Sequence, residues 1–155
     1  VDATEWVGPY NDYFMKFYEA AKYYYTGGMH EPGGGLGFGM NLDFWNNCTD
    51  HEKAVITAAC MEENAAQPEE AMANNGTYLQ KLVDEHGTQL RSYNDDVWDA
   101  FGEASAEVFE ETRQHSEMAA RVNDSYMSAL RDIGGFRAIA EIEFSQQRNR
   151  VLGLT

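Results

Sequence analysis

The chain of 155 residues has the length of one domain, and its 43% apolar and 13% aromatic content excludes a disordered protein. It carries 26 acidic and 11 basic side chains, which gives a formal charge of −15. Such a surface repels the phosphates of nucleic acids and of anionic lipids, so we expect neither as a partner. No apolar run approaches the roughly 20 residues that a membrane span needs.

The chain begins at Val1, without a Met and without the charged, apolar and small segments of a secretory leader. We therefore expect a mature, processed or excised piece of a polypeptide. If a helix begins near Asp50, Cys60 lies roughly 15 Å along it. This separates Cys60 from Cys48 by more than the roughly 7 Å between Cα atoms that a disulfide allows, so both cysteines are expected to be unpaired.

Residues 1–41 are rich in glycine, aromatic residues and turns, whereas residues 50–151 are mostly helical in pattern. Pro9 suits the first turn of a helix, because no amide donor is needed there. The apolar residues that follow at helical spacing are Phe14, Phe17, Tyr18, Ala21 and Tyr25. This pattern predicts a helix that ends at Gly27–Gly28.

Two features of residues 1–41 indicate close contacts with something else. Adjacent helical residues diverge by about 100°, so at least one of Tyr23, Tyr24 and Tyr25 is expected at a cleft or an interface. Further on, Leu36, Phe38 and Met40 alternate with glycines. That pattern predicts a strand with one bare face, over which a backbone or a ligand passes closely.

The segment "LDFWNNC" predicts a helical turn, and a longer helix follows, capped by Thr49 or Asp50. Pro68 is expected to break or kink this helix, and the two acidic residues behind it to restart it. The helix is predicted to end at Gly87, before a short extended piece, "TQLRSYN".

The rest of the chain predicts further helices, the first of them capped by Asn94 or Asp95. That helix carries an apolar stripe of Val97, Trp98, Phe101, Val108 and Phe109. A second apolar stripe consists of Met118, Val122, Tyr126, Leu130 and Ile133. Gly134–Gly135 is expected to interrupt this helix, which then resumes toward Val151. We expect part of the surface that covers these stripes to lie outside this chain.

Taken one by one, the polar motifs do not indicate catalysis. The chain has no nucleophile elbow and no phosphate-binding loop, and no two of its histidines stand at the i, i+4 spacing of a helical zinc site. The acidic runs lack the spacing of a calcium-binding loop. Glu5–Trp6 alone is typical of an exposed acid beside a core indole, and His30–Glu31 of a turn. We therefore expect no enzyme.

Taken together and in order, three segments are more specific: "DATEWVGPYND", "AKYYYTGGMHEPGGGLGFGMN", and "LDFW" before long amphipathic helices. This order resembles the C-terminal half of TRAP transporter substrate-binding proteins, and more narrowly the branch that binds 2-oxo acids and related carboxylates. The resemblance implies an α/β periplasmic-binding-protein-like fold when intact, of which this segment is mainly α-helical with a few short strands. Residues 1–155 would contribute to both lobes, residues 1–41 with cleft strands and a helix and residues 42–155 with the helical part.

The resemblance also implies a function and a site. The protein would be a periplasmic receptor that delivers a small carboxylate to TRAP membrane subunits. In this branch a cation, Na+ or Ca2+, bridges protein and ligand. By analogy the Glu5 carboxylate and the Trp6 main-chain carbonyl would ligate the cation, and Glu31 would complete its surroundings. Glu5, Trp6 and Tyr24 would contact the substrate.

Two further points follow from the resemblance. The family's ligand-clamping arginine comes from the other half of the protein, and Arg91 lies in a different context. The long C-terminal helices of the family can mediate dimerisation, which predicts a possible homodimer. The alternative is that the chain is a helical, self-associating segment without ligand-binding activity.

Overall fold

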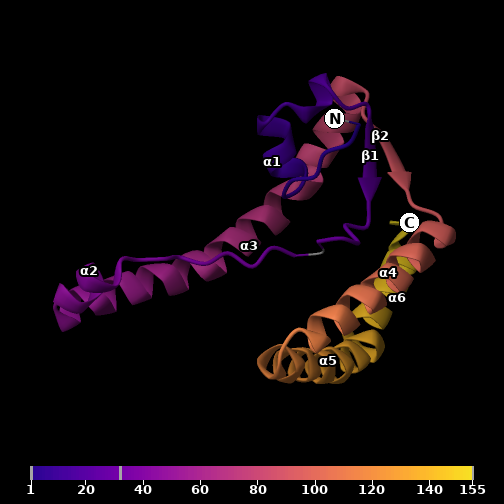
Figure 1. Cartoon of the computed structure of the whole chain (residues 1–155). Coiled ribbons are helices and arrows are strands. Elements are labelled where there is room, and N and C mark those ends of the chain that lie inside the picture. The colour runs from indigo at the N-terminus through magenta and orange to yellow at the C-terminus, as the bar shows by residue number, and fades with distance from the viewer. Residues whose placement is uncertain (1, 32, 155) are drawn as a thin grey trace. The chain divides into compact units, whose positions relative to one another are not determined.

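The computed structural model describes residues 2–31 and 33–154 and divides the chain into two compact units, Val1–Asp95 and Asp96–Thr155. Most of the described residues are helical, and the strands are two short ones (Figure 1). This confirms the expectation of a mainly α-helical segment with a few short strands. The two units are described in turn.

The first unit contains a short helix, a long helix and a small sheet. Its elements in chain order are α1 (Pro9–Phe14), a 3-10 turn (Phe17–Glu19), β1 (Tyr23–Thr26), α2 (Leu42–Asn47), α3 (Asp50–His86) and β2 (Gln89–Ser92). Strands β1 and β2 are parallel, with Tyr23 opposite Gln89 and Tyr24 opposite Leu90.

Both ends of α3 follow the sequence prediction. At the N-terminus, Glu52 donates its backbone N–H to Thr49 Oγ1 over 3.3 Å, and the Glu52 carboxylate accepts from the Thr49 backbone over 2.8 Å. At the C-terminus, Gly87 adopts φ +67° and donates to Val83 O. A left-handed residue of this kind favours glycine and ends the helix.

Of the two outcomes predicted at Pro68, a break does not occur, because α3 is a single helix of 37 residues that contains Pro68. A proline removes one helical hydrogen bond and costs about 3 kcal/mol in a helix interior. The flanking turns are rich in alanine, glutamate and methionine, which propagate a helix well. Here this propagation outweighs the local cost of the proline.

The helix predicted from Pro9 to Gly27–Gly28 is also wrong in its second half. Helix α1 ends at Phe14, and Lys16 turns the chain with a left-handed φ of 56°. The run Tyr23–Thr26 is a strand instead, because β2 supplies a hydrogen-bonding partner that the local helical spacing could not reveal. Tyrosine and threonine suit such a strand.

The strand predicted for Leu36, Phe38 and Met40 does not form, since residues 34–41 carry no regular structure. Leu36 is 85% exposed and Phe38 72%. Within the described residues this alternating segment has no strand beside it, and an unpaired strand is not stable. The predicted turn at "LDFWNNC" is confirmed as α2, which Asn41 caps by accepting from Phe44 N over 3.0 Å.

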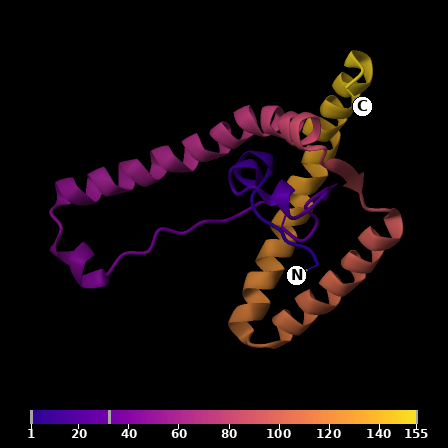
Figure 2. The same ribbon diagram turned by 90° about the horizontal axis from the view of Figure 1, so that it is seen from above.

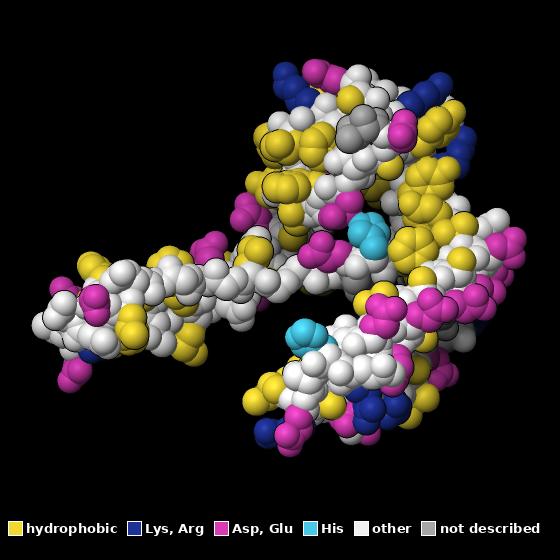
Figure 3. Space-filling view, viewed as in Figure 1, with side chains coloured by type: hydrophobic (Ala, Val, Ile, Leu, Met, Phe, Trp, Pro, Cys, Tyr) yellow, Lys and Arg dark blue, Asp and Glu magenta, His cyan; other side chains and the backbone are white. Residues whose placement is uncertain are grey.

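The core of the first unit lies where α1 packs on the C-terminal half of α3 (Figure 2). Leu82 is 2% exposed, and among the described residues it is the one hydrophobic side chain that is buried. The Tyr78 ring contacts the rings of Tyr10, Tyr13 and Phe14 at centroid distances of 5.0, 5.1 and 5.3 Å. Hydrophobic side chains accordingly gather over α1 on the surface shown in Figure 3.

The second unit consists of α4 (Asp95–Gln114), α5 (Glu117–Arg137), a π-helix (Ala138–Ile142) and α6 (Glu143–Leu152). Helices α4 and α5 are joined where they meet by an Arg113–Asp124 ion pair of 2.9 Å and by the Phe109 and Tyr126 rings. Helix α5, the π-helix and α6 follow one another as one rod (Figure 2).

The interruption predicted at Gly134–Gly135 is wrong, because α5 continues through both glycines. Glycine weakens a helix by about 1 kcal/mol but does not forbid its geometry. The irregularity lies just beyond, in the π-helix Ala138–Ile142. A π-helix is a local widening of the helical turn and leaves no simple sequence signal.

Two smaller observations concern the cysteines and the apolar stripe of α5. Cys48 and Cys60 are both free. The apolar stripe on α5 is exposed, from 49% for Leu130 to 61% for Met118 and Val122. Of the helices in residues 2–31 and 33–154, none combines the length and the apolar character required to cross a bilayer.

Replacing Pro68 by Ala is expected to stabilise the protein, by up to about 3 kcal/mol, because the missing hydrogen bond of α3 is restored and the ring is removed. The measurement is the free energy of unfolding in urea. Gln67→Ala, at the neighbouring exposed position, is the matched control and should change stability by only a few tenths of a kcal/mol. An unfolding free energy that is equal or lower in Pro68→Ala would contradict the account of α3.

Candidate functional site

The N-terminal segment before α1 carries Glu5 and Trp6, the first two predicted site residues, in irregular backbone. Glu5 Oε2 lies 3.8 Å from His30 Nε2, and both side chains are close to half exposed. Trp6 is 56% exposed. The structure therefore brings Glu5 beside the residue that directly precedes Glu31.

Glu31 lies in a tight turn after β1. Gly27 and Gly28 have φ values of 108° and 46°, which only glycine adopts readily, and Glu31 donates its backbone N–H to Gly28 O over 3.1 Å. The Glu31 side chain is exposed. The glycine pair thus turns the chain so that the His30–Glu31 pair follows β1 directly.

In residues 2–31 and 33–154, no three His, Cys, Asp or Glu side chains form a group that could hold a metal ion. The predicted set consists of two carboxylates and one main-chain carbonyl, from Glu5, Glu31 and Trp6. Ca2+ takes six to eight oxygen ligands, so a cation here would need further oxygens from a ligand, from water or from other residues. This set stays a prediction.

Tyr24, the fourth predicted residue, faces the protein interior from β1. Its hydroxyl donates a hydrogen bond of 2.5 Å to Oδ2 of Asp12, on α1. Burial is the main cause that raises the pKa of the Asp12 carboxyl above its ordinary value, and the nearby Glu5 charge raises it further. Burial and the Asp12 carboxylate also raise the pKa of Tyr24. Tyr24 is therefore a neutral hydrogen-bond donor to Asp12, and its contact with a substrate stays a prediction.

The neighbouring tyrosines of β1 have different surroundings. The Tyr23 ring lies 5.5 Å from the Arg91 guanidinium, and the Tyr25 ring stacks on Tyr93 at 4.7 Å. Both tyrosines are about half exposed. Arg91 is thus held at the surface by β1 and β2, which agrees with its exclusion from a ligand-clamping role.

A small cavity of about 30 Å³ lies beneath α1. It is lined by Asp12, Phe17, Tyr18, Ala21, Tyr23, Tyr24, Leu82 and Thr88. The burial of Asp12 and of Thr88 was not predicted from the sequence. Neither has a local signal, because Asp12 resembles an ordinary first-turn acid and Thr88 an ordinary strand-edge residue. Their burial depends on β1 and α3 coming together.

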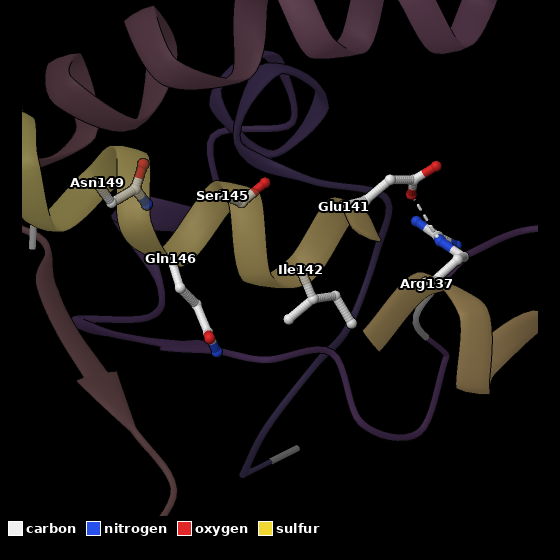
Figure 4. A pocket seen from close by; sticks show the side chains of 6 residues that line it. All are labelled: Arg137, Glu141, Ile142, Ser145, Gln146 and Asn149. Atoms are coloured by element: carbon white, nitrogen blue, oxygen red, sulfur yellow. Dashed lines mark hydrogen bonds and ion pairs between the residues drawn. The ribbon is translucent and has the colours of Figure 1, made fainter. Parts of the chain in front are cut away.

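A larger hollow of about 390 Å³ lies on the second unit, along the π-helix and α6. Figure 4 shows its lining side chains, which are Arg137, Glu141, Ile142, Ser145, Gln146 and Asn149. Arg137 and Glu141 form an ion pair of 2.8 Å between exposed side chains. The hollow is open to solvent and its charges are already paired, so it does not resemble a ligand site.

The chain matches the family profile described as bacterial extracellular solute-binding protein, family 7, over residues 1–115. It is 29% identical over 144 residues to the monocarboxylate 2-oxoacid-binding periplasmic protein of Nostoc sp.. That alignment covers 93% of this chain and 39% of the relative, so the chain spans about two fifths of the curated relative's length. No solved structure gives a significant match. The predicted site residues all lie within the matched residues.

Tyr24→Phe is expected to destabilise the protein by about 1–3 kcal/mol, because it leaves the buried Asp12 Oδ2 without its donor. The free energy of unfolding in urea at neutral pH measures the effect. Tyr23→Phe, on the same strand but with an exposed ring, is the control and should be nearly neutral. Equal unfolding free energies for the two variants would show that the Tyr24–Asp12 bond contributes nothing.

The raised pKa of Asp12 predicts a pH dependence of stability. Because the folded-state pKa lies above the unfolded value of about 3.9, the carboxyl contributes stability that is complete below that value. This contribution is lost as the pH rises through the folded-state pKa. The unfolding free energy of the wild type relative to Asp12→Asn should therefore fall with increasing pH.

Urea titrations of both proteins between about pH 3 and 7 measure this difference. Glu63→Gln removes one charge at an exposed position of α3 and serves as the control for net charge. A difference between wild type and Asp12→Asn that rises with pH, or stays constant, would contradict the assigned pKa direction.

Proposed function

Because this chain belongs to family 7 of the bacterial extracellular solute-binding proteins, we propose that its protein is a periplasmic receptor of a TRAP transporter. Its ligand would be a 2-oxo acid or a related carboxylate, which it would deliver to the TRAP membrane subunits. The family match and the similarity to the 2-oxoacid-binding protein of Nostoc sp. support this proposal. A solute-binding family is not an enzyme family, and the proposed activity requires no catalysis.

The observation that supports a bridging cation is an accessible carboxylate in an acidic chain. Glu5 is 44% exposed in its side chain, and the chain has a formal charge of −15. An anionic ligand near Glu5 would be repelled unless a cation lay between the two carboxylates. Na+ or Ca2+, both hard cations that prefer oxygen ligands, would remove this repulsion.

The roles of the individual residues follow from this arrangement. The Glu5 carboxylate and the Trp6 carbonyl would each supply one oxygen to the cation, and Glu31 would supply negative charge from the adjoining turn. The exposed Trp6 indole would cover the ligand and exclude water. Tyr24 would contribute through its ring, because its hydroxyl is bonded to Asp12.

The test is calorimetry with pyruvate on the full-length polypeptide, since this chain spans 39% of its relative. Glu5→Gln should weaken binding by about tenfold or more, equivalent to about 1.4 kcal/mol, because one anionic cation ligand is lost. Glu63→Gln is the matched control and should leave the affinity unchanged. The wild type should lose affinity when sodium is removed and divalent ions are chelated.

Two results would contradict the proposal at different levels. Equal affinity of the wild type with and without cations would remove the cation bridge but keep the receptor. Absence of binding to any of a series of 2-oxo and 2-hydroxy acids would remove the carboxylate ligand itself.

We also propose that the second unit associates with another copy of the chain, as a homodimer. The observation in favour is the α5 stripe, five apolar residues at helical spacing that are 49–61% exposed. Exposed apolar patches of this kind mark interaction surfaces. If the chain were a helical, self-associating segment without ligand-binding activity, the same stripe would mediate the association.

Sedimentation equilibrium tests this association. The wild type should sediment as a dimer and Leu130→Asp as a monomer, because a charge within the stripe cannot be buried without a partner. Ala129→Asp, at an adjoining exposed position outside the stripe, is the control and should stay dimeric. A monomeric wild type would contradict the proposal, whereas a dimer that does not bind carboxylates at full length would favour the alternative.

A further inference from the structure

We propose that the cavity beneath α1 holds one ordered water molecule, which hydrogen-bonds Asp12 Oδ1 and Thr88 Oγ1 and joins α1 to the turn between α3 and β2. The proposal concerns the interior of the first unit and does not depend on the proposed ligand. It assigns to Thr88 the role of a positioning residue for Asp12.

Two buried oxygens without partners are the first observation. Asp12 and Thr88 are each 6% exposed, and both line this cavity. Asp12 Oδ1 and Thr88 Oγ1 are fully shielded and make no hydrogen bond to any residue in the described part of the chain. A buried oxygen left unpaired is destabilising, so two of them beside one cavity indicate a missing partner.

The size of the cavity fits one water molecule. Its volume is about 30 Å³. A water needs at least about 10–15 Å³ of such space and two to four polar partners. A water can donate one O–H to Asp12 Oδ1 and bond the Thr88 hydroxyl with its other O–H or with its oxygen. Both unpaired atoms would then be satisfied at once.

The chemistry of the lining favours water over a metal ion. Beyond Asp12 and Thr88 the wall is aromatic and aliphatic, and the Tyr24 hydroxyl already donates to Asp12 Oδ2. Calcium requires six or more oxygens, and magnesium an octahedral set. Two side-chain oxygens cannot provide either set, whereas they suffice for a water.

The consequence is a defined position for Tyr24. Tyr24 fixes one oxygen of Asp12, and the water would fix the other against Thr88, which follows the C-terminal Gly87 of α3. The Asp12 carboxylate would then be held from two sides and could not rotate. Because Tyr24 belongs to β1, this network would fix the position of β1 within the first unit.

High-resolution crystal structures of the wild type, Thr88→Val and Thr88→Ser test the proposal. The wild type should show a solvent peak about 2.7–3.1 Å from both Asp12 Oδ1 and Thr88 Oγ1. Thr88→Ser should retain the peak, because it keeps the hydroxyl. Thr88→Val should lose the peak or show it bonded to Asp12 alone, and the Asp12 carboxylate should become less ordered.

Several results would overturn the proposal, and the wild-type map alone can supply most of them. These are an empty cavity, a direct bond between Thr88 and Asp12, or a peak with short distances of about 2.0–2.6 Å that indicate a metal ion. If Thr88→Val fails to fold, the wild-type and Thr88→Ser maps still decide. An unchanged peak and an unchanged Asp12 in Thr88→Val would exclude the positioning role of Thr88.

Discussion

The packing of α1 on the C-terminal half of α3 is the contact on which the first unit depends. Asn75 on α3 accepts a hydrogen bond of 3.1 Å from the backbone of Tyr10, at the start of α1. At Gly8 a Cβ atom would come within 3.3 Å of the Asn75 side chain, so a larger residue would require that side chain to shift by a few tenths of an ångström. Leu82 and the Tyr78 ring, which packs on Tyr10, complete this contact.

Because α1 is held against α3, the residues within α1 and the segments that flank it also have defined positions. Asp12 points into the unit and meets Tyr24 on β1, and β1 in turn pairs with β2, which follows α3. The segment that carries Glu5 leads directly into α1. A short helix with a small interface therefore fixes the position of both the buried acid and the exposed one.

The sequence predicted those features of the fold that depend on neighbours in the chain. Thr49 with Glu52, and Gly87 at a left-handed C-cap, are local patterns, and the structure contains both. Features that depend on distant partners were predicted wrongly. Tyr23–Thr26 became a strand through β2, and the segment around Leu36 to Met40 stayed irregular because no described strand lies beside it. Two local features were predicted wrongly as well, because α3 continues through Pro68 without a break and α5 continues through Gly134–Gly135.

The candidate site likewise contains residues that were predicted from the sequence and residues that only the structure reveals. Glu5, Trp6, Tyr24 and Glu31 were selected by the order of motifs along the chain, and geometry adds only that Glu5 lies beside His30. Asp12 and Thr88 could not have been found in this way. They are buried because α1, β1 and the C-terminal end of α3 pack together, and no residue spacing in the sequence predicts that packing.

The two acidic residues of this region have opposite environments, and this contrast indicates which of them can serve a ligand. Asp12 is 6% exposed, its Oδ1 is shielded from solvent, and its pKa is raised, which disfavours its charge. Glu5 is close to half exposed, and its charge is one of the causes of the raised pKa of Asp12. A cation attracted to this region would find an accessible carboxylate at Glu5 and a shielded one at Asp12. Asp12 is therefore suited to hold β1 against α1, and Glu5 is the carboxylate that remains available for recognition.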